Sequence, residues 1–272
     1  MILADAHVHI YPGWPLDDFL DAAWTHFRRY HPPQRRSDSL DPFLLLTEGS
    51  GHRVFRALHS AAETHRWEGS LPAPRRWRLH PTAEPISVLT ESVEDAEVRI
   101  VIAAGRQVVT RERLEVLCLF SDRRVSDGLS LAETVDAIHE SGGIPVTPWG
   151  VGKWIGRRGD ILRQFLHKPP MPFWLGDNGG RPSFWPTPRL FRIAANAGIG
   201  VLPGSDPLPL RADRYRAGSY GFRLAGSADP DRPAQVLRHR IRTLPKGFSP
   251  YGRRLKTLPF LIRQIQLRCS GR

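Results

Sequence analysis

The stretch ADAHVHIYPGW (residues 4–14) decides how the chain is interpreted, because it sets a carboxylate and two histidines at alternate positions near the N-terminus. Its first half continues the apolar character of a buried β-strand, and the turn-forming YPGWP separates it from a helical pattern over residues 16–30. In a strand, residues two apart share one face. Asp5, His7 and His9 are therefore predicted to project together from the end of the first strand.

Two imidazoles with nearby carboxylates are the donor set of many catalytic metal sites. Neutral imidazole nitrogens bind zinc and other divalent first-row metals. Further ligands must come from distant parts of the chain, and acidic residues stand at several predicted strand ends: Glu48, Glu115, Asp177 and Asp206. Spacing alone does not choose among them. The alternative is a polar strand end whose histidines make only structural hydrogen bonds.

Strand-like and helical segments alternate along most of the chain. An apolar run at 42–49 precedes a helical pattern, residues 97–120 have a β-rich pattern, and a strand is predicted at 144–150. Between them, Ser130 and Glu133 form the capping box of a predicted helix. This alternation favours a parallel α/β barrel in a single domain, which a chain of 272 residues can form.

Composition restricts the classes of partner. The chain has 39 Lys and Arg against 27 Asp and Glu, a formal net charge of +12, but no nucleic-acid recognition motif accompanies the charge. We therefore expect no specific nucleic-acid partner. The positive charge is still compatible with a small anionic substrate. No apolar run approaches the roughly 18 residues of a membrane span, and no secretory signal is visible. The expected location is the cytoplasm.

Four stretches resemble, in their order along the chain, the metal-site motifs of the PHP (polymerase and histidinol phosphatase) family. They are DAHVHIYP (5–12), LEVLCL (114–119), LAETVDAIHESGGIPVTPWG (131–150) and GIGVLPGSDPLP (198–209). The chain is also similar to the broader amidohydrolase-like group, whose barrels begin with HxH. For either group the resemblance implies a distorted TIM-like β/α barrel and a hydrolytic reaction, often phosphoester cleavage in PHP proteins. It also implies one or more divalent metal ions, such as zinc, manganese or iron.

The resemblance also implies site residues. His7 and His9 match the first motif as metal ligands, Glu115 matches the mid-chain acidic ligand, and Asp206 matches the late aspartate. Asp177 is a further candidate ligand. Two family histidines are missing, because the chain has VTPWG where histidine-proline is typical and DPL where aspartate-x-histidine is frequent. A reduced site with one or two metals, or a site that has lost catalysis, is implied.

Two cations stand near these departures from the family pattern. Lys153 lies in PWGVGKWIGRRGD (148–160), and Arg181 lies in GDNGGRPSFWP (176–186). Cations beside a metal site can hold an anionic substrate or stabilise negative charge in a transition state. We predict this catalytic role for both. The alternative is that each pairs with a nearby carboxylate while the neighbouring tryptophans pack the loops.

Taken together, residues 1–245 are predicted to form a PHP-like metal-dependent hydrolase. The metal would activate water and polarise the scissile group, and Asp206 or another carboxylate would manage the proton. A phosphoester is the leading substrate, followed by an amide or lactone bond. The rival is a noncatalytic PHP-like binding or regulatory protein. Residues 246–272 are predicted to form a basic helical segment packed on the barrel that could touch acidic lipid headgroups.

Overall fold

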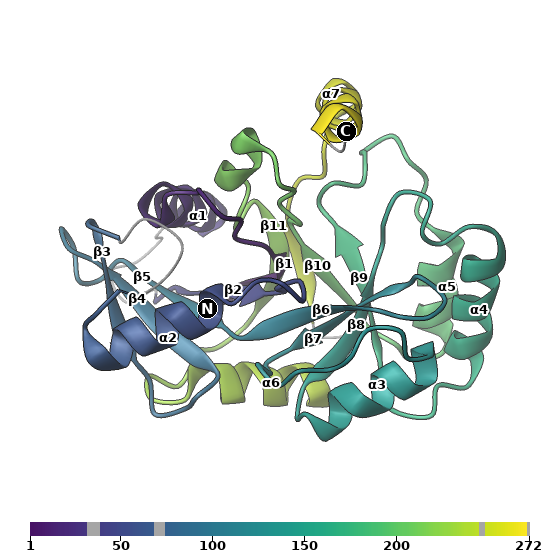
Figure 1. Cartoon of the computed structure of the whole chain (residues 1–272), viewed down its shortest axis with the longest axis horizontal. Coiled ribbons are helices and arrows are strands. Elements are labelled where there is room, and N and C mark those ends of the chain that lie inside the picture. The colour runs from purple at the N-terminus through teal and green to yellow at the C-terminus, as the bar shows by residue number, and fades with distance from the viewer. Residues whose placement is uncertain (32–38, 68–73, 245–247, 271–272) are drawn as a thin grey trace.

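A computed structural model of the chain describes residues 1–31, 39–67, 74–244 and 248–270 and contains two β-sheets with helices around them (Figure 1). The strands of the larger sheet are β1 (Ile2–Val8), β2 (Asp41–Leu46), β3 (Trp77–Pro81), β4 (Ser87–Ser92), β5 (Arg99–Ala103), β11 (Tyr220–Leu224) and β12 (Ser249–Gly252). Those of the smaller sheet are β6 (Gly105–Val109), β7 (Glu115–Leu119), β8 (Ile144–Pro148), β9 (Trp174–Asn178) and β10 (Val201–Gly204).

Seven α-helices and one 3₁₀ helix accompany the sheets in the described part of the chain. They are α1 (Leu16–Tyr30), α2 (Val54–Thr64), α3 (Leu131–Glu140), α4 (Gly156–His167), α5 (Arg189–Asn196), α6 (Pro233–Thr243), α7 (Thr257–Ser270) and the short 3₁₀ helix η1 (Arg211–Tyr215). Figure 1 shows α1 and α2 on the side of the larger sheet and α3, α4 and α5 on the side of the smaller one, with α6 beneath both. The predicted helix after Ser130 is confirmed with its capping box.

The strand order corrects the predicted barrel. The larger sheet runs β12-β11-β1-β2-β5-β4-β3 and the smaller runs β10-β9-β8-β7-β6, so the described strands form two open mixed sheets rather than one closed TIM-like barrel. Several neighbouring pairs are antiparallel, including β3 with β4, β4 with β5, β6 with β7 and β11 with β12. The prediction was wrong because the central part of the chain forms meanders of strands, which need no crossover helix.

β1 is the strand around which the site is built. All seven of its residues are buried, because it lies between β11 and β2 in the middle of the larger sheet. Ile2, Ala4 and Ala6 pack into the apolar cluster that also contains residues of α6 and of the smaller sheet. Leu3 and Val8 belong to the cluster under α1 and α2. Such burial on both faces explains the near-continuous apolar sequence of this strand.

The two sheets touch at two places where glycine permits close approach of the backbones. Gly105 is the first residue of β6, and a Cβ atom there would overlap the Leu46 carbonyl oxygen at the end of β2. Gly204 ends β10, and a Cβ atom there would overlap the backbone of His7. Backbone hydrogen bonds cross both contacts: Glu48 N–H donates to the Gly105 oxygen (3.1 Å), and Asp206 N–H donates to the His7 oxygen (2.9 Å).

The C-terminal segment consists of a strand and a helix in its described part. β12 pairs with β11 at the edge of the larger sheet, and α7 follows and stands away from the sheets in Figure 1. Phe260 and Arg263 of α7 are buried, whereas Leu258 and Ile265 on the same helix are exposed. No helix among the described residues is long and apolar enough to cross a membrane.

Substitution Gly105→Ala tests the contact between the sheets. We expect it to lower the free energy of unfolding by about 2–4 kcal/mol, because the added methyl group meets backbone that cannot move without disturbing β2. Gly49→Ala is the matched control, since a Cβ atom at Gly49 meets nothing within 4 Å. Urea denaturation measures both variants, and equal stability of the two would contradict the close approach.

Candidate metal site

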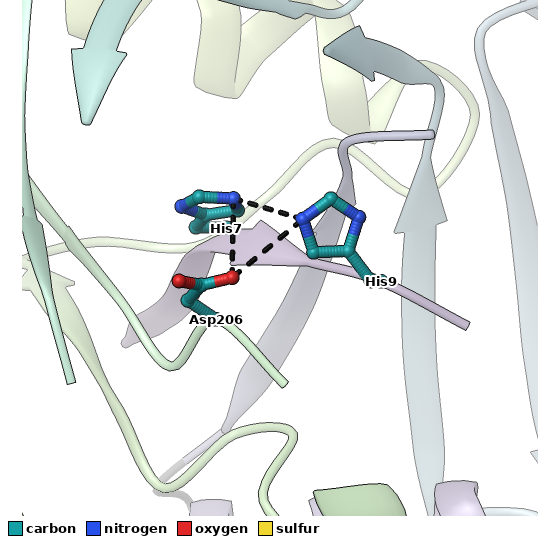
Figure 2. Close-up of side chains that lie close together, drawn as sticks. All are labelled: His7, His9 and Asp206. Atoms are coloured by element: carbon teal, nitrogen blue, oxygen red, sulfur yellow. Dashed lines mark hydrogen bonds and ion pairs between the residues drawn. The ribbon is translucent and has the colours of Figure 1, made fainter. Parts of the chain in front are cut away.

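Two histidines and an aspartate converge where the ends of β1 and β10 meet. The Nε2 atoms of His7 and His9 lie 3.0 Å apart. The Oδ1 atom of Asp206 lies 3.5 Å from the His7 Nε2 atom and 3.6 Å from that of His9. Figure 2 shows the three side chains turned toward one another. Both histidines are buried and the Asp206 side chain is 14% exposed, so the three donor atoms face a small space largely shielded from solvent.

The backbone explains how residues some 200 positions apart in the chain meet here. The pairing of β1 with β2 shifts in register between Asp5 and Val8, at the end of the strand that carries the histidines. Asp206 has a φ of +47°, a left-handed conformation that aspartate tolerates better than most residues. Its N–H donates to the His7 carbonyl oxygen, which ties the aspartate directly to the histidine strand.

The three separations are compatible with ligands of one metal ion, although the 3.0 Å separation of the two Nε2 atoms also suits a hydrogen bond. Four ligands placed tetrahedrally at about 2.0–2.1 Å from zinc are about 3.3 Å from one another. The measured separations of 3.0, 3.5 and 3.6 Å bracket this value. As hydrogen bonds, the two contacts to Asp206 would be long and weak. A possible metal site formed by His7, His9 and Asp206 is therefore present, and among the described residues it is the group whose donor atoms converge in this way.

The protonation states of these groups suit metal binding. Burial, together with the neighbouring His7, lowers the pKa of His9 to about 3, which leaves its imidazole neutral and able to donate a lone pair. Burial alone would raise the pKa of the Asp206 carboxyl. The nearby His7, His9 and Arg263 nevertheless hold this pKa below its usual value, so Asp206 is ionised at neutral pH.

A second layer of polar contacts fixes Asp206. The Asn178 Nδ2 group donates to the Asp206 Oδ2 atom and to the Trp149 carbonyl oxygen, the latter at 3.2 Å. Arg263 of α7 donates from Nη2 to the Asp206 carbonyl oxygen at 2.8 Å and from Nε to the Asp213 Oδ2 atom at 2.9 Å. Because Asn178 holds Oδ2, the other carboxylate oxygen is the one turned toward the imidazoles. Groups that orient a ligand in this way tune its affinity for metal.

Asp5 has a structural role instead of facing the two imidazoles. Its Oδ1 atom accepts the backbone N–H groups of His7 (3.2 Å) and Ser205 (2.8 Å), and its Oδ2 atom accepts the N–H of Gly218 (2.8 Å). The carboxylate thus joins the end of β1 to the loop after β10 and to the chain before β11. Glu48 likewise faces backbone, since its Oε1 atom accepts the N–H of Phe55 in the first turn of α2 (2.8 Å).

Glu115 and Lys153 form an ion pair at the same edge of the smaller sheet. Glu115 begins β7, which runs antiparallel to β8, so this residue stands beside the chain that leaves β8. Lys153 Nζ donates to Glu115 Oε1 at 3.0 Å, and both side chains are partly exposed. The structure does not bring Glu115 into the group with His7 and His9, and its role as a ligand stays a prediction, as does the contact of Lys153 with substrate.

Asp177 and Arg181 form a buried pair. Arg181 donates from Nε to Asp177 Oδ1 (2.8 Å) and from Nη2 to Asp177 Oδ2 (2.9 Å). The hydroxyl of Tyr220 also donates to Oδ2, at 2.7 Å. Both carboxylate oxygens are thus engaged and the guanidinium already holds its counter-ion. This geometry corresponds to the structural alternative for Arg181, and neither residue joins the histidine group. Their assignments as metal ligand and substrate contact stay predictions.

Sequence reasoning missed three residues around the site. Tyr11 continues the alternate spacing of the two histidines, and its ring centroid lies 5.7 Å from that of His9, so the pattern itself could have indicated it. Asn178 directly follows Asp177, a candidate ligand predicted from the sequence. Arg263 belongs to a helix whose sequence carries no motif, and only the tertiary structure brings it to Asp206.

Comparisons with known proteins add information on the fold. The sequence matches no protein-family model and no curated protein. The crystal structure of PsfC from Pseudomonas syringae PB-5123 is similar, with 16% identity, a TM-score of 0.55 and alignment over 99% of this chain and 98% of PsfC. This similarity shows that the two chains share a fold and leaves activity open.

Weaker similarity links the chain to two structures of Endonuclease Q. One is the lesion-specific endonuclease PfuEndoQ from Pyrococcus furiosus, with 11% identity, a TM-score of 0.48 and alignment over 86% of this chain. The other is an Endonuclease Q complex with a 27-mer duplex substrate with an abasic lesion at the active site, with 13% identity, a TM-score of 0.46 and alignment over 89%. This chain spans 56% of each Endonuclease Q chain.

Removal of both imidazoles tests the metal site. We expect the double variant His7→Ala, His9→Ala to remain folded and to lose high-affinity binding of zinc, because one carboxylate alone is a weak ligand. Isothermal titration calorimetry with zinc and elemental analysis of the purified protein measure the loss. The matched control is His167→Ala, His239→Ala, which removes two exposed histidines on α4 and α6. Undiminished zinc binding by the first variant would remove the assignment.

Proposed function

We propose that the chain is a metal-dependent hydrolase that cleaves a phosphoester, and that it is a divergent relative of the PHP family. The convergence of His7, His9 and Asp206 on one point, at separations that suit a divalent ion, is the observation that carries this proposal. The order of the motif-like stretches along the chain supports it. A bound divalent ion would act there as a Lewis acid and provide hydroxide at neutral pH.

Individual residues of the chain would bind the metal ion, orient its ligands and contact the substrate. The imidazoles of His7 and His9 would hold the ion through their Nε2 atoms, and Asp206 would hold it through Oδ1. Asn178 keeps Asp206 Oδ2 in a hydrogen bond, which orients the carboxylate for this task. At the same edge of the sheet, the Lys153 ammonium beside Glu115 supplies a positive charge suited to an anionic substrate.

The donor set favours hydrolysis by a site with few metal ions. Two imidazoles and one carboxylate are three protein ligands, the number found in catalytic zinc sites, whereas the structural sites that only stabilise a fold have four. The net charge of +12 suits a small anionic substrate such as a phosphoester. An amide or lactone bond is the second choice of substrate, since the same metal chemistry cleaves it.

A phosphoesterase assay with metal replacement tests the proposal. The purified chain, stripped of metal and reloaded separately with zinc, manganese or iron, is expected to hydrolyse 4-nitrophenyl phosphate or bis(4-nitrophenyl) phosphate. The stripped protein should lose at least about a hundredfold in rate, because a metal commonly provides several kcal/mol of transition-state stabilisation. The variant His7→Ala, His9→Ala should match the stripped protein, whereas His167→Ala, His239→Ala should match the parent.

The noncatalytic alternative makes a different forecast in the same assay. A binding or regulatory protein would take up metal and bind phosphate esters without turning them over. Stoichiometric metal with no hydrolysis of phosphoester, amide or lactone substrates would therefore contradict the proposed function and favour this alternative.

A further inference from the structure

A pocket is lined by chain segments that follow two of the candidate metal ligands, His9 and Asp206. Its volume is about 670 Å³, and it opens between the loop after β1 and the chain that leads into η1. Tyr11 and Trp14 line one side, and Pro209, Arg211 and Arg214 line the other. In Figure 1, η1 is the short green helix between α1 and α7. We call this cavity the Arg211 pocket.

One lining residue, Tyr11, links the Arg211 pocket to the candidate metal site. Tyr11 is two residues beyond His9, and their ring centroids are 5.7 Å apart. Pro209 is three residues beyond Asp206 on the other side. Short chain segments therefore join both histidine and aspartate ligands to residues that line the pocket.

Positive charge in the pocket exceeds the negative charge available to it. The Arg211 side chain is exposed, and neither an ion pair nor a hydrogen bond joins it to another residue in the described part of the chain. Arg214 reaches Asp18 only at 3.6 Å, and its Nε atom is buried without a hydrogen-bond partner. Asp18 also pairs with Arg76 at 3.4 Å, so it is shared. Arg214 Nη2 also donates to the neutral Tyr215 hydroxyl, which balances no charge. Among the described residues, the two pocket arginines thus have one carboxylate between them, which is itself shared with Arg76, and an anion in the pocket would balance the remaining positive charge.

The aromatic walls indicate what accompanies the anion. Tyr11 and Trp14 pack edge to face at 5.1 Å, and the Arg214 guanidinium lies 4.5 Å from the centre of the Tyr215 ring. Such rings bind planar apolar groups, and the exposed Arg211 guanidinium near them can donate to a carboxylate or phosphate. By contrast, the buried Arg181 guanidinium already holds the Asp177 carboxylate through two hydrogen bonds.

We propose that the Arg211 pocket binds a carboxylate or phosphate group on the non-reacting end of the substrate, with a planar part of the substrate against Tyr11 and Trp14. This assignment rests on the proposed function, because that function defines the substrate. Binding of an anion in the pocket itself requires no metal ion. It adds to that function a substrate class: a phosphoester with a second anionic group and an aromatic or otherwise planar body.

Binding of small aromatic probes tests the pocket separately from hydrolysis. Dissociation constants of 2-naphthoate and its neutral analogue 2-naphthamide are measured by ligand-observed NMR titration. The metal-free parent should bind 2-naphthoate about fivefold or more tightly than 2-naphthamide. Arg211→Met should reduce this preference, and Arg211→Met combined with Arg214→Met should abolish it. The matched control Arg192→Met, which alters an exposed arginine on α5, should keep it.

Further variants separate failure of the pocket from failure of the proposed function. In the variant His7→Ala, His9→Ala the preference for 2-naphthoate should persist, because the pocket arginines are intact. A titration of 2-naphthyl phosphate against this variant then shows whether phosphate or carboxylate binds more tightly. Equal binding of naphthoate and naphthamide by the parent, or an unchanged preference in Arg211→Met, would overturn the proposal. If the double arginine variant misfolds, Arg211→Met decides the matter alone, because the Arg211 side chain is exposed and forms no hydrogen bond or ion pair with the residues that the structure describes.

Discussion

The close approach of β10 to β1 is the constraint on which the candidate site depends. Only a residue without a Cβ atom fits at position 204, where the chain passes against the backbone of His7. The next two residues then turn, and the Asp206 N–H reaches the His7 carbonyl oxygen. This hydrogen bond fixes a carboxylate beside two imidazoles that the end of β1 already holds together. The site is therefore a product of how the two sheets meet.

Buried polar groups keep this contact in place. The Asp5 carboxylate accepts hydrogen bonds from backbone N–H groups of three segments, one of which belongs to Ser205, the residue before Asp206. Asn178 holds the Asp206 side chain, and Arg263 holds its carbonyl oxygen. Because α7 contributes Arg263, the last helix of the chain is coupled to the metal site although it stands away from the sheets. Loss of any one partner would leave a buried polar group unsatisfied, which costs more than a hydrogen bond contributes.

The predictability of the structure varies along the chain for physical reasons. Local signals were sufficient for β1, for α1 and for the capped helix after Ser130, because periodicity and capping are properties of neighbouring residues. The barrel was predicted wrongly, since strand direction depends on pairing between distant segments. The resemblance placed Asp206 with the histidines, and the structure brings the three together. The contact of Arg263 with Asp206 could not be predicted from the sequence, because the two residues are 57 positions apart and no local motif marks Arg263.

The ligand shell of a bound ion tests the central claim most directly. X-ray absorption spectroscopy of the purified chain loaded with one equivalent of zinc reports the number and type of ligand atoms. The account predicts a shell of four or five light atoms at about 2.0–2.1 Å, with the multiple-scattering signature of two imidazoles and one carboxylate. A shell of oxygen atoms alone, without imidazole scattering, would contradict it.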